Sequence, residues 1–216
     1  MDFGGFNMNP AFQKLSLEKQ KNIIEAAVLE FAEKGYEQAS TNRIVKEAKI
    51  GKGTLFYYFQ NKEDLYQYIL NACLDNVFNQ LLHKINTEET DFIERLKQIA
   101  QVKAAYHLEY PHDLSLLGTA FLQEEDAPIP DNAKKKYEEM IKLQEKMMYD
   151  DIDHSLFRKD LDPVKSFRLI QWTLSGYQEE LTQRLKLQDL SSIDLDPYWE
   201  EFYAYMEELK KVFYHE

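Results

Sequence analysis

The 216-residue sequence predicts an all-α fold, and three observations support this class. Apolar side chains recur at helical spacing through most of the chain, and no segment keeps the two-residue alternation of a strand. Asp-Pro pairs at 162–163 and 196–197 put a proline at the first position of a helix, where its missing N–H is tolerated. Only seven Gly and six Pro are present, so the connections between helices are expected to be short.

The composition is that of a globular protein without disulfides. Its 44% hydrophobic residues are enough for a core, and the single cysteine, Cys73, excludes an intrachain bridge. Apolar runs fall short of the roughly 18 residues that span a bilayer, and residues 1–12 lack the basic start and apolar stretch of a signal peptide. We therefore expect a cytoplasmic protein without membrane segments, in which residues 1–15 form a flexible arm.

The first strong helix is expected over residues 17–34. Ser16 is a suitable N-cap, and Gly35 is suited to the left-handed position that ends many helices. Its core stripe consists of Ile24, Ala27, Val28 and Phe31.

The stretch from Ser40 to Asp64 predicts a helix-turn-helix. A short helix starts at Ser40 or Thr41, and a tight turn over 49–51 leads to a second short helix near Lys52. The residues expected to point inward from the second helix are Leu55, Phe56 and Phe59. In a helix-turn-helix the second helix enters the major groove of DNA.

The residues left on the outward arc of the second helix suit nucleic acid. Lysine and threonine side chains can reach base edges or phosphates, and tyrosine hydroxyls bond phosphate oxygens. These outward residues are Lys52, Thr54, Tyr57 and Tyr58, with the small Gly53 allowing a close approach. Asn61 is expected to cap the next helix together with Asp64, and Lys62 adds a charge at that phosphate-attracting helix start.

The segment resembles the DNA-binding domain of the tetracycline-repressor (TetR) family of bacterial regulators. That family's motif reads as a Thr-initiated helix, an Ala-Gly-Val turn, Ser-Lys-Gly-Thr-Leu-Tyr-x-Tyr-Phe and a Lys-Glu pair. The matching residues here are 41–48, 49–51, 52–59 and 62–63, and the resemblance covers 17–64. The residues that it implies at DNA are Thr41, Asn42, Arg43, Lys52, Gly53, Thr54 and Tyr57, with Tyr58 and Lys62 on phosphates.

Two residues depart from the family pattern. Lys49 stands where the turn usually has glycine, and Gly51 stands where serine is common. We expect a positive φ at Lys49, which is uncommon outside Gly, Asn and Asp. The lysine would then either weaken the turn or supply one more phosphate contact.

Further helices are expected after the motif. The one over 62–85 has a broad apolar face and would act as a lever between two domains. The others are expected over about 91–110, 113–124, 133–157, 163–186 and from 196 close to the C-terminus, with a loop over 124–132.

Charge supports a domain boundary at residue 62. Residues 1–62 hold 9 Lys or Arg against 7 Asp or Glu, a net +2, whereas residues 63–216 hold 17 against 31, a net −14. A DNA-binding domain over 1–62 would therefore use a local basic face, and the acidic domain over 63–216 would weaken non-specific binding.

The last two helices carry more aromatic side chains than an intrachain core requires. Aromatic residues and Met are enriched at protein interfaces, and Gly176 would allow a close helix approach. TetR-like proteins dimerise through a four-helix bundle made from these helices, so the resemblance implies a homodimer. The alternative is that the aromatic residues simply fill the core.

An effector site is expected among the helices over 62–186. Ligand pockets are mostly apolar with a few placed polar groups, and a flexible or aromatic, weakly polar ligand would suit these residues. The candidates for the wall are Leu70, Leu74, Phe78, Phe92, Leu96, Tyr106, Leu117, Phe121, Met140, Leu143, Met147, Trp172 and Tyr177.

Together these features predict a ligand-responsive repressor that binds a palindromic double-stranded operator as a homodimer, without cofactor or metal. One alternative is a ligand- or partner-binding module whose helix-turn-helix does not bind DNA. The other is a bundle enzyme, which would need a metal. Two acid-x-x-His pairs, 109–112 and 151–154, are its only support, and Pro111 interrupts the first. We therefore expect no catalytic residues.

Overall fold

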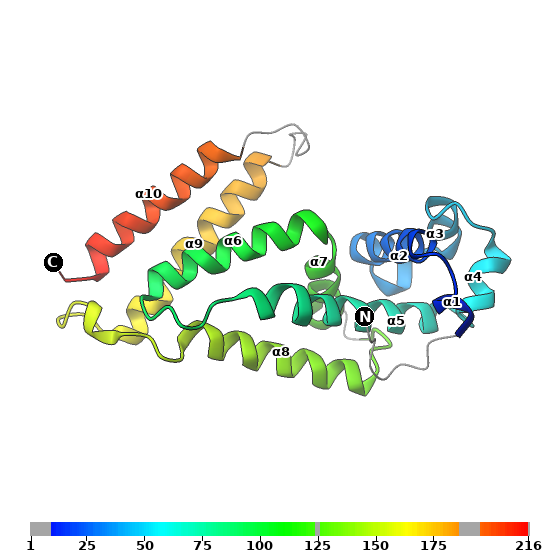
Figure 1. Cartoon of the computed structure of the whole chain (residues 1–216), viewed down its shortest axis with the longest axis horizontal. Helices are drawn as coiled ribbons and strands as arrows, with labels where there is room; N and C mark the ends of the chain where they lie inside the picture. Colours follow the sequence, from blue (N-terminus) through cyan, green and yellow to red (C-terminus); the bar gives the residue numbers. More distant parts are fainter. Residues whose placement is uncertain (1–9, 124–125, 186–194, 216) are drawn as a thin grey trace. The chain divides into compact units, whose positions relative to one another are not determined.

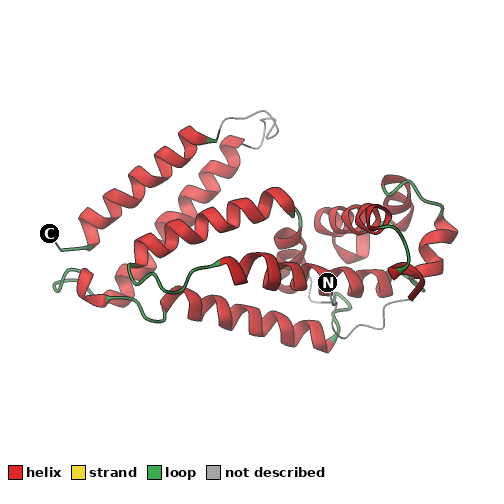
Figure 2. Cartoon of the chain, viewed as in Figure 1, coloured by secondary structure: helices red, strands yellow, loops and turns green. Residues whose placement is uncertain are grey.

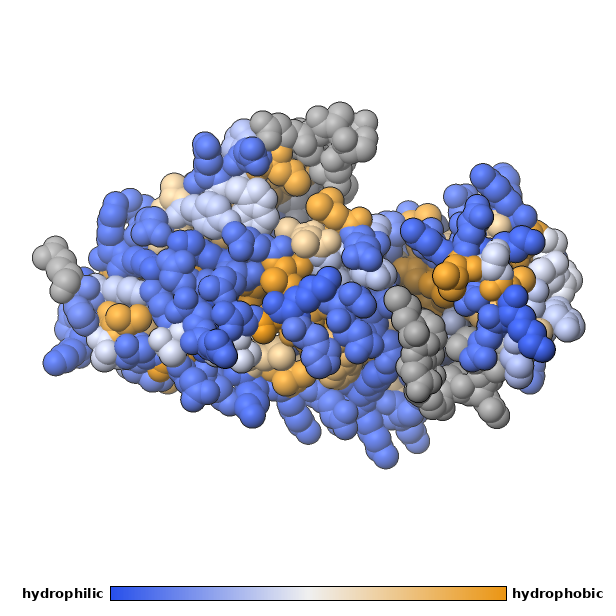
Figure 3. Space-filling view, in the orientation of Figure 1, coloured by the Kyte–Doolittle hydropathy of each residue, from blue (hydrophilic) through white to orange (hydrophobic). Residues whose placement is uncertain are grey.

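The computed structural model describes residues 10–123, 126–185 and 195–215, which form helices joined by loops (Figure 1). Figure 2 shows helix and loop over these ranges, and the only extended pairing recorded there is an isolated bridge between Phe157 and Tyr214. The all-α class is confirmed. No described helix is long and apolar enough to cross a membrane, and hydrophilic side chains cover most of the face drawn in Figure 3.

The helices follow the predicted order. The α-helices are α1 (Pro10–Gln13), α2 (Leu17–Gln38), α3 (Thr41–Glu47), α4 (Lys52–Tyr58), α5 (Lys62–Asn76), α6 (Phe92–Glu109), α7 (Asp113–Gly118), α8 (Asp131–Tyr149), α9 (Pro163–Leu185) and α10 (Asp196–Phe213). Two π-helical turns, η1 (Val77–Leu81) and η3 (Thr119–Gln123), extend α5 and α7. Two short 3₁₀ turns are η2 (Leu82–Lys84) and η4 (His154–Leu156).

The chain divides into two compact units that alternate along the sequence. The first contains residues 1–85 and 101–147, and the second contains 86–100 and 148–216. Helix α6 begins in the second unit and ends in the first. The two units do not follow the expected boundary at residue 62, which was based on charge and on the motif and stays a prediction.

The first unit is built around α5, which packs against α2 and α7. Both the predicted apolar face and the residues beside it are buried, so this helix is enclosed on nearly all sides. The buried residues of α5 include Leu65, Tyr66, Ile69, Leu70, Ala72 and Leu74. Since α7 also contacts α2, the three-helix element α2–α4 shares one hydrophobic core with α5 and α7.

Two helix ends differ from the prediction. Helix α2 reaches Gln38 rather than Lys34, but it is kinked at Gly35, whose φ of 66° is the left-handed value expected there. Helix α8 ends at Tyr149, so the predicted helix over 133–157 is too long. Arg95 holds the chain beyond it by donating from Nη1 to the Asp150 carbonyl (2.6 Å), a tertiary contact that local periodicity does not reveal.

The expected flexible arm over residues 1–15 is wrong from residue 10 onward. Pro10–Gln13 form the short helix α1, and the Phe12 side chain is fully buried in the core of the first unit. An aromatic ring that leaves water completely stabilises the fold by about 2–3 kcal/mol, enough to order a short segment. Residues 1–9 lie outside the described residues.

The second unit packs α9, α10 and the start of α6 around a separate core that includes Phe92, Ile170 and Phe202. A polar network closes one side of it. The Lys210 ammonium lies 2.9 Å from Asp91 Oδ2 and 2.6 Å from Glu94 Oε1, and Tyr214 donates its hydroxyl to Asp91 Oδ1 (2.6 Å). Burial opposes the charged form of Asp91, but these hydrogen bonds outweigh it and lower the pKa of that carboxyl.

Helices α9 and α10 keep apolar side chains outside this core. On α9, Leu169 is 47% exposed and Trp172 is 65% exposed, so the expectation that Trp172 lines a pocket is wrong for this chain alone. On α10, Tyr205 and Val212 are also exposed, while Phe202 and Met206 face inward. Both helices therefore carry exposed apolar side chains that the core of this chain does not use, as the sequence predicted.

Candidate nucleic-acid interface

The helix-turn-helix is formed by α3 and α4 on an apolar wedge. Ile44 on α3 and Ala48 directly after α3 are buried. So are Leu55 on α4 and Phe59 directly after α4. Between the helices, Lys49 adopts φ 55°, which confirms the predicted left-handed turn residue. Lysine has a Cβ that disfavours this region, so the turn is held by its surroundings, including the Ile50 N–H bonded to the Val45 carbonyl (3.0 Å).

Helix α4 presents three of its four predicted outward residues to solvent, whereas Tyr58 is half-buried and packs against the core of the first unit. Lys52, Gly53 and Thr54 are exposed, and Tyr57 is 66% exposed. A Cβ placed on Gly53 would have open space around it, so packing within this chain does not require a glycine there. This exposed face combines hydrogen-bonding side chains with a position where the helix backbone itself can be approached.

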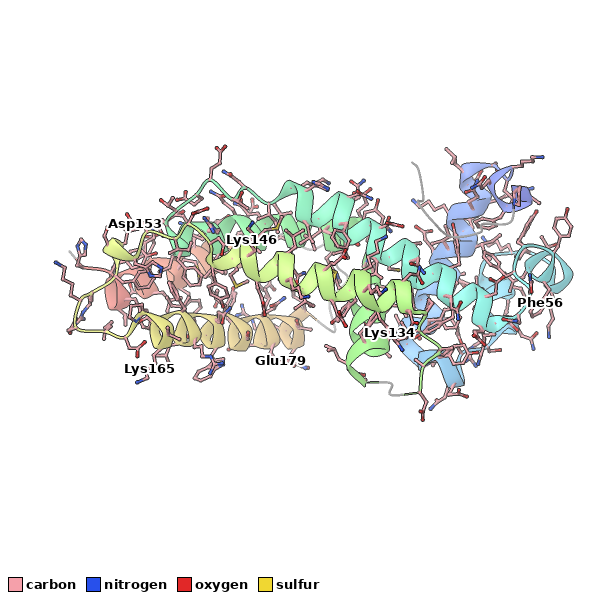
Figure 4. The ribbon with its side chains drawn as sticks, turned by 90° about the horizontal axis from the view of Figure 1, so that it is seen from below. Phe56, Lys134, Lys146, Asp153, Lys165 and Glu179 are labelled. Atoms are coloured by element: carbon pink, nitrogen blue, oxygen red, sulfur yellow. The ribbon has the colours of Figure 1, made fainter. Side chains whose placement is uncertain are left out.

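One inward prediction for α4 is wrong. Phe56 is 37% exposed, and it lies on the outer side of α4 in Figure 4, with the Lys52 ammonium 6.0 Å from its ring centroid. A helix of seven residues packed on one side buries only one stripe, here Leu55 and Phe59 four residues apart. Phe56 follows Leu55 by about 100° around the helix and so points out of the wedge.

Arg43 joins α3 to α2 rather than projecting free from the surface. Its Nε donates to both carboxylate oxygens of Glu30 (2.8 and 2.9 Å), and Nη2 also donates to the Gln38 carbonyl (3.0 Å). The Ser40 N–H donates to the same carboxylate (2.8 Å), which fixes the start of α3. Burial opposes ionisation of Glu30, but the bonds from Arg43 and Ser40 prevail and lower its pKa.

Lys62 also has an internal use. Its ammonium donates to the carbonyls of Tyr36 (2.7 Å) and Glu37 (3.1 Å), and it lies 4.5 Å from the Tyr36 ring centroid. Carbonyls at a helix C-terminus lack intrahelical donors and attract cations, so Lys62 ties the first turn of α5 to the end of α2. The predicted phosphate contact stays a prediction.

The start of α5 is capped as predicted. The Asp64 N–H donates to Asn61 Oδ1 (2.8 Å), and Asp64 Oδ2 accepts in return from the Gln60 N–H (3.0 Å). The reciprocal bond therefore reaches one residue further back than in a standard capping box. Thr41 and Asn42 occupy the first turn of α3.

The predicted effector wall does not form one set. Nine candidates pack in the core of the first unit: Leu70, Leu74, Phe78, Tyr106, Leu117, Phe121, Met140, Leu143 and Met147. Phe92, Leu96 and Tyr177 pack in the second unit, and Trp172 is exposed. A surface hollow lies beside Arg158, Lys159, Asp160 and His215, and it contains none of the candidates.

Sequence reasoning missed a polar group inside the first of these cores. The carboxylate of Asp113 is buried at 4% exposure, and its Oδ2 accepts from the Tyr106 hydroxyl (2.9 Å) and from Asn76 Nδ2 (2.9 Å). Burial beside this carboxylate raises the pKa of Tyr106 and of the Cys73 thiol, so both stay protonated at neutral pH. The cluster gives a mostly apolar core one placed polar centre.

Comparison with known proteins identifies the helix-turn-helix. The family model described as "Bacterial regulatory proteins, tetR family" matches residues 23–69. The HTH-type transcriptional regulator SAUSA300_2515 of Staphylococcus aureus (strain USA300) is 31% identical over 156 residues, covering 72% of this chain and 76% of that protein. The chain belongs to the TetR family of bacterial transcriptional regulators. The predicted resemblance is confirmed, and proteins of this family are regulators rather than enzymes.

Another relative matches a shorter part of the chain at higher identity. An uncharacterized regulator of Bacillus subtilis, YuxN, is 46% identical over 66 residues, which is 31% of this chain but only 23% of that relative. The crystal structure of a TetR family regulator from Chloroflexus aurantiacus J-10-FL superposes with a TM-score of 0.65 at 19% identity, covering 97% of this chain and 99% of that chain. The similarity to the solved TetR-family structure is one of fold.

The residues described contain no group of three or more His, Cys, Asp or Glu that could hold a metal ion. The exposed α4 face and the internal bonds of Arg43 and Lys62 are polar features that the structure shows at the helix-turn-helix.

Proposed function

We propose that the protein is a ligand-responsive repressor that binds a palindromic operator as a homodimer. The observation that carries the DNA-binding part is the α4 face, where Lys52, Thr54 and Tyr57 are exposed above a buried wedge. These side chains can donate to base edges and phosphates in the major groove. Tyr58, at the end of α4, would contact a phosphate through its hydroxyl.

A second copy of this chain is the proposed partner of α9 and α10. Leu169, Trp172 and Gly176 lie at i, i+3 and i+7 on α9, so they form one exposed stripe. A Cβ on Gly176 would also meet nothing within 4 Å, which supports a close approach from outside the chain. A palindromic operator has two half-sites, and each half-site requires one copy of α4. A homodimer supplies both copies.

The proposed effector site lies in the core of the first unit, around Asp113. Nine of the expected wall residues pack there, and α7, which carries Asp113, contacts both α2 and α5. A weakly polar ligand with an aromatic or flexible body would displace these helices and so change the position of α4. Two half-sites about 34–36 Å apart, or a multiple, tolerate little displacement. The ligand must prefer one state by several kcal/mol to switch the protein fully.

A helix-turn-helix that does not bind DNA is a second candidate function, and two observations favour it. Arg43 already binds Glu30, and Lys62 already binds carbonyls of α2. Each side chain would have to give up these bonds to contact DNA. Residues 63–216 also carry a net −14 charge. In this case the chain would bind a ligand or partner without binding DNA.

A gel-shift experiment separates the two functions. The full-length protein is titrated against duplex DNA from upstream of its own gene at about 50 and 150 mM salt, beside a scrambled duplex of equal length. Salt-dependent binding that prefers the upstream DNA supports the repressor. The absence of binding to that duplex and to pooled genomic fragments at both salt concentrations supports the alternative.

A further inference from the structure

The ring of Phe12 packs at the C-terminal end of α4. It is 0% exposed and makes three edge-to-face contacts, with ring centroids 5.5 Å from Tyr58, 5.1 Å from Phe59 and 5.6 Å from Tyr68. Tyr58 is the last residue of α4, Phe59 follows it, and Tyr68 belongs to α5. One residue from α1 therefore packs against both the end of α4 and α5, whose Phe59 and Tyr68 rings also contact each other at 5.3 Å.

The segment that carries Phe12 is fastened to α2. The Leu15 N–H donates to the Phe12 carbonyl (3.1 Å), and Gln20 Nε2 donates to the carbonyls of Leu15 (2.9 Å) and Gln13 (3.3 Å). These bonds close the chain around residues 12–15, and Leu15 packs against the same core. The ring is thus held both by its aromatic neighbours and by the backbone that carries it.

We propose that Phe12 is a positioning residue for DNA binding, which fixes the ring of Tyr58 so that its hydroxyl is ready to meet a phosphate. The inference rests on the proposed function, since Tyr58 is assigned there to a phosphate. Helix α4 has only seven residues, and a helix this short takes its stability from tertiary contacts. Phe12 supplies two of those contacts at the end of α4, to Tyr58 and to Phe59.

Preorganisation explains how a buried ring can affect binding. Tyr58 is only partly buried, and an aromatic side chain that is free to rotate loses entropy when it is immobilised against a phosphate. With Phe12 in place, that restriction exists before DNA arrives. A ring that served only the core would lower the stability of the fold without changing how binding depends on salt.

The test compares two phenylalanines that are equally buried. Phe12→Leu keeps an apolar side chain at the site, and Phe31→Leu is the control because Phe31 is also 0% exposed but packs on Tyr66, at 4.8 Å between centroids. Affinity for the upstream duplex is measured against salt, and thermal unfolding is recorded for each variant. We expect F12L to weaken binding about tenfold and to reduce the salt slope by about one phosphate contact.

Tyr58→Phe completes a double-mutant cycle. Removing the hydroxyl should weaken binding and flatten the salt slope, and adding F12L to this background should then change affinity less than twofold, because both act through the same contact. F31L should lower the unfolding temperature but leave the salt slope unchanged. If F12L does not fold, Phe12→Met replaces it, since methionine adapts to the same space.

The outcomes separate the inference from the proposed function. If the wild-type protein binds no DNA, or if Tyr58→Phe binds as well as wild type, the proposed phosphate contact fails and the role of Phe12 fails with it. If Tyr58→Phe is impaired while F12L matches F31L in affinity and salt slope, only the role of Phe12 is wrong. Additive effects of F12L and Tyr58→Phe also overturn it.

Discussion

Helices α4 and α9 both expose side chains that packing within the chain leaves unused, but the two exposed faces differ in chemistry. The α4 face carries Lys52, Thr54 and Tyr57, which offer charge and hydrogen bonds. The α9 face carries Leu169 and Trp172, whose exposed area is almost entirely apolar or aromatic. The difference agrees with the two proposed partners: a nucleic acid needs donors for phosphates and bases, whereas binding of a protein partner is favoured by burial of apolar area.

Each face also includes a glycine that packing within the chain does not require. Gly53 on α4 and Gly176 on α9 both have open space where a Cβ would stand. Glycine inside a helix costs up to about 1 kcal/mol relative to alanine, so both helices carry a local cost. A partner that approaches the backbone closely would offset it, and the comparison predicts two different partners.

The largest effect is expected from a charge on the α9 face. Trp172→Asp should shift the protein from dimer to monomer and weaken operator binding, because a central aromatic residue at an interface contributes about 2–4 kcal/mol. Sedimentation equilibrium and gel shift measure the two effects. Leu122→Asp is the matched control, since Leu122 is 74% exposed in the other unit. A Trp172→Asp protein that stays dimeric would remove α9 from the proposed interface.

Substitutions on the α4 face should act on sequence preference. Lys52→Ala and Thr54→Val are each expected to cost about 1–3 kcal/mol with the preferred duplex if these residues reach base edges, and much less with other sequences. Binding is measured against a panel of single-base variants of the upstream duplex. Equal losses on every duplex would mean that both residues contact only the backbone.

Lys62→Ala tests the internal contact found in the structure. Loss of the bonds to the Tyr36 and Glu37 carbonyls should lower the free energy of unfolding by about 1 kcal/mol, since capping interactions at helix ends have this size. Chemical denaturation measures it, and Lys52→Ala, on an exposed site, is the control. A flattened salt slope in Lys62→Ala without a loss of stability would favour the phosphate role instead.

The two glycines give a paired test of the comparison. Gly176→Ala and Gly53→Ala should each leave the fold as stable or stabilise it by up to about 1 kcal/mol. Gly176→Ala should nevertheless weaken the dimer, and Gly53→Ala should weaken DNA binding while leaving the dimer intact. Denaturation, sedimentation and gel shift are compared for both variants. The pairing fails if Gly53→Ala weakens the dimer, or if Gly176→Ala weakens DNA binding at protein concentrations where it is still dimeric.

The smallest effect is expected from the pH dependence of Glu30. Its pKa in the folded protein is lowered from about 4.5, so its bond to Arg43 contributes stability above that pH, and this contribution is lost as the pH falls through the lowered value. Urea unfolding from pH 7 to pH 3 should show a decline that is shallower in Glu30→Gln. Identical curves for the two proteins would mean that other carboxylates dominate.

Local signals predicted the helix-turn-helix closely. The positive φ at Lys49 followed from the resemblance, which places this lysine where the family's turn usually has glycine. The Asn61 cap followed from its position before Lys62, and the break at Gly35 from the residue type. Each depends on a few neighbouring residues, so the sequence alone carries enough information. Phe56 was predicted wrongly because a seven-residue helix gives too few turns to define its buried stripe.

The sequence by itself determined the all-α class, the order of the helices and the family. The tertiary structure decided the burial of Phe12, the use of Arg43 and Lys62 inside the fold, the division of the expected effector wall between two cores, and the exposure of Trp172. The physical reason is the sequence separation of the residues that interact. A cap or turn is fixed by residues within a few positions, whereas these contacts join residues 13 to more than 40 positions apart, and their energies depend on packing that periodicity does not encode.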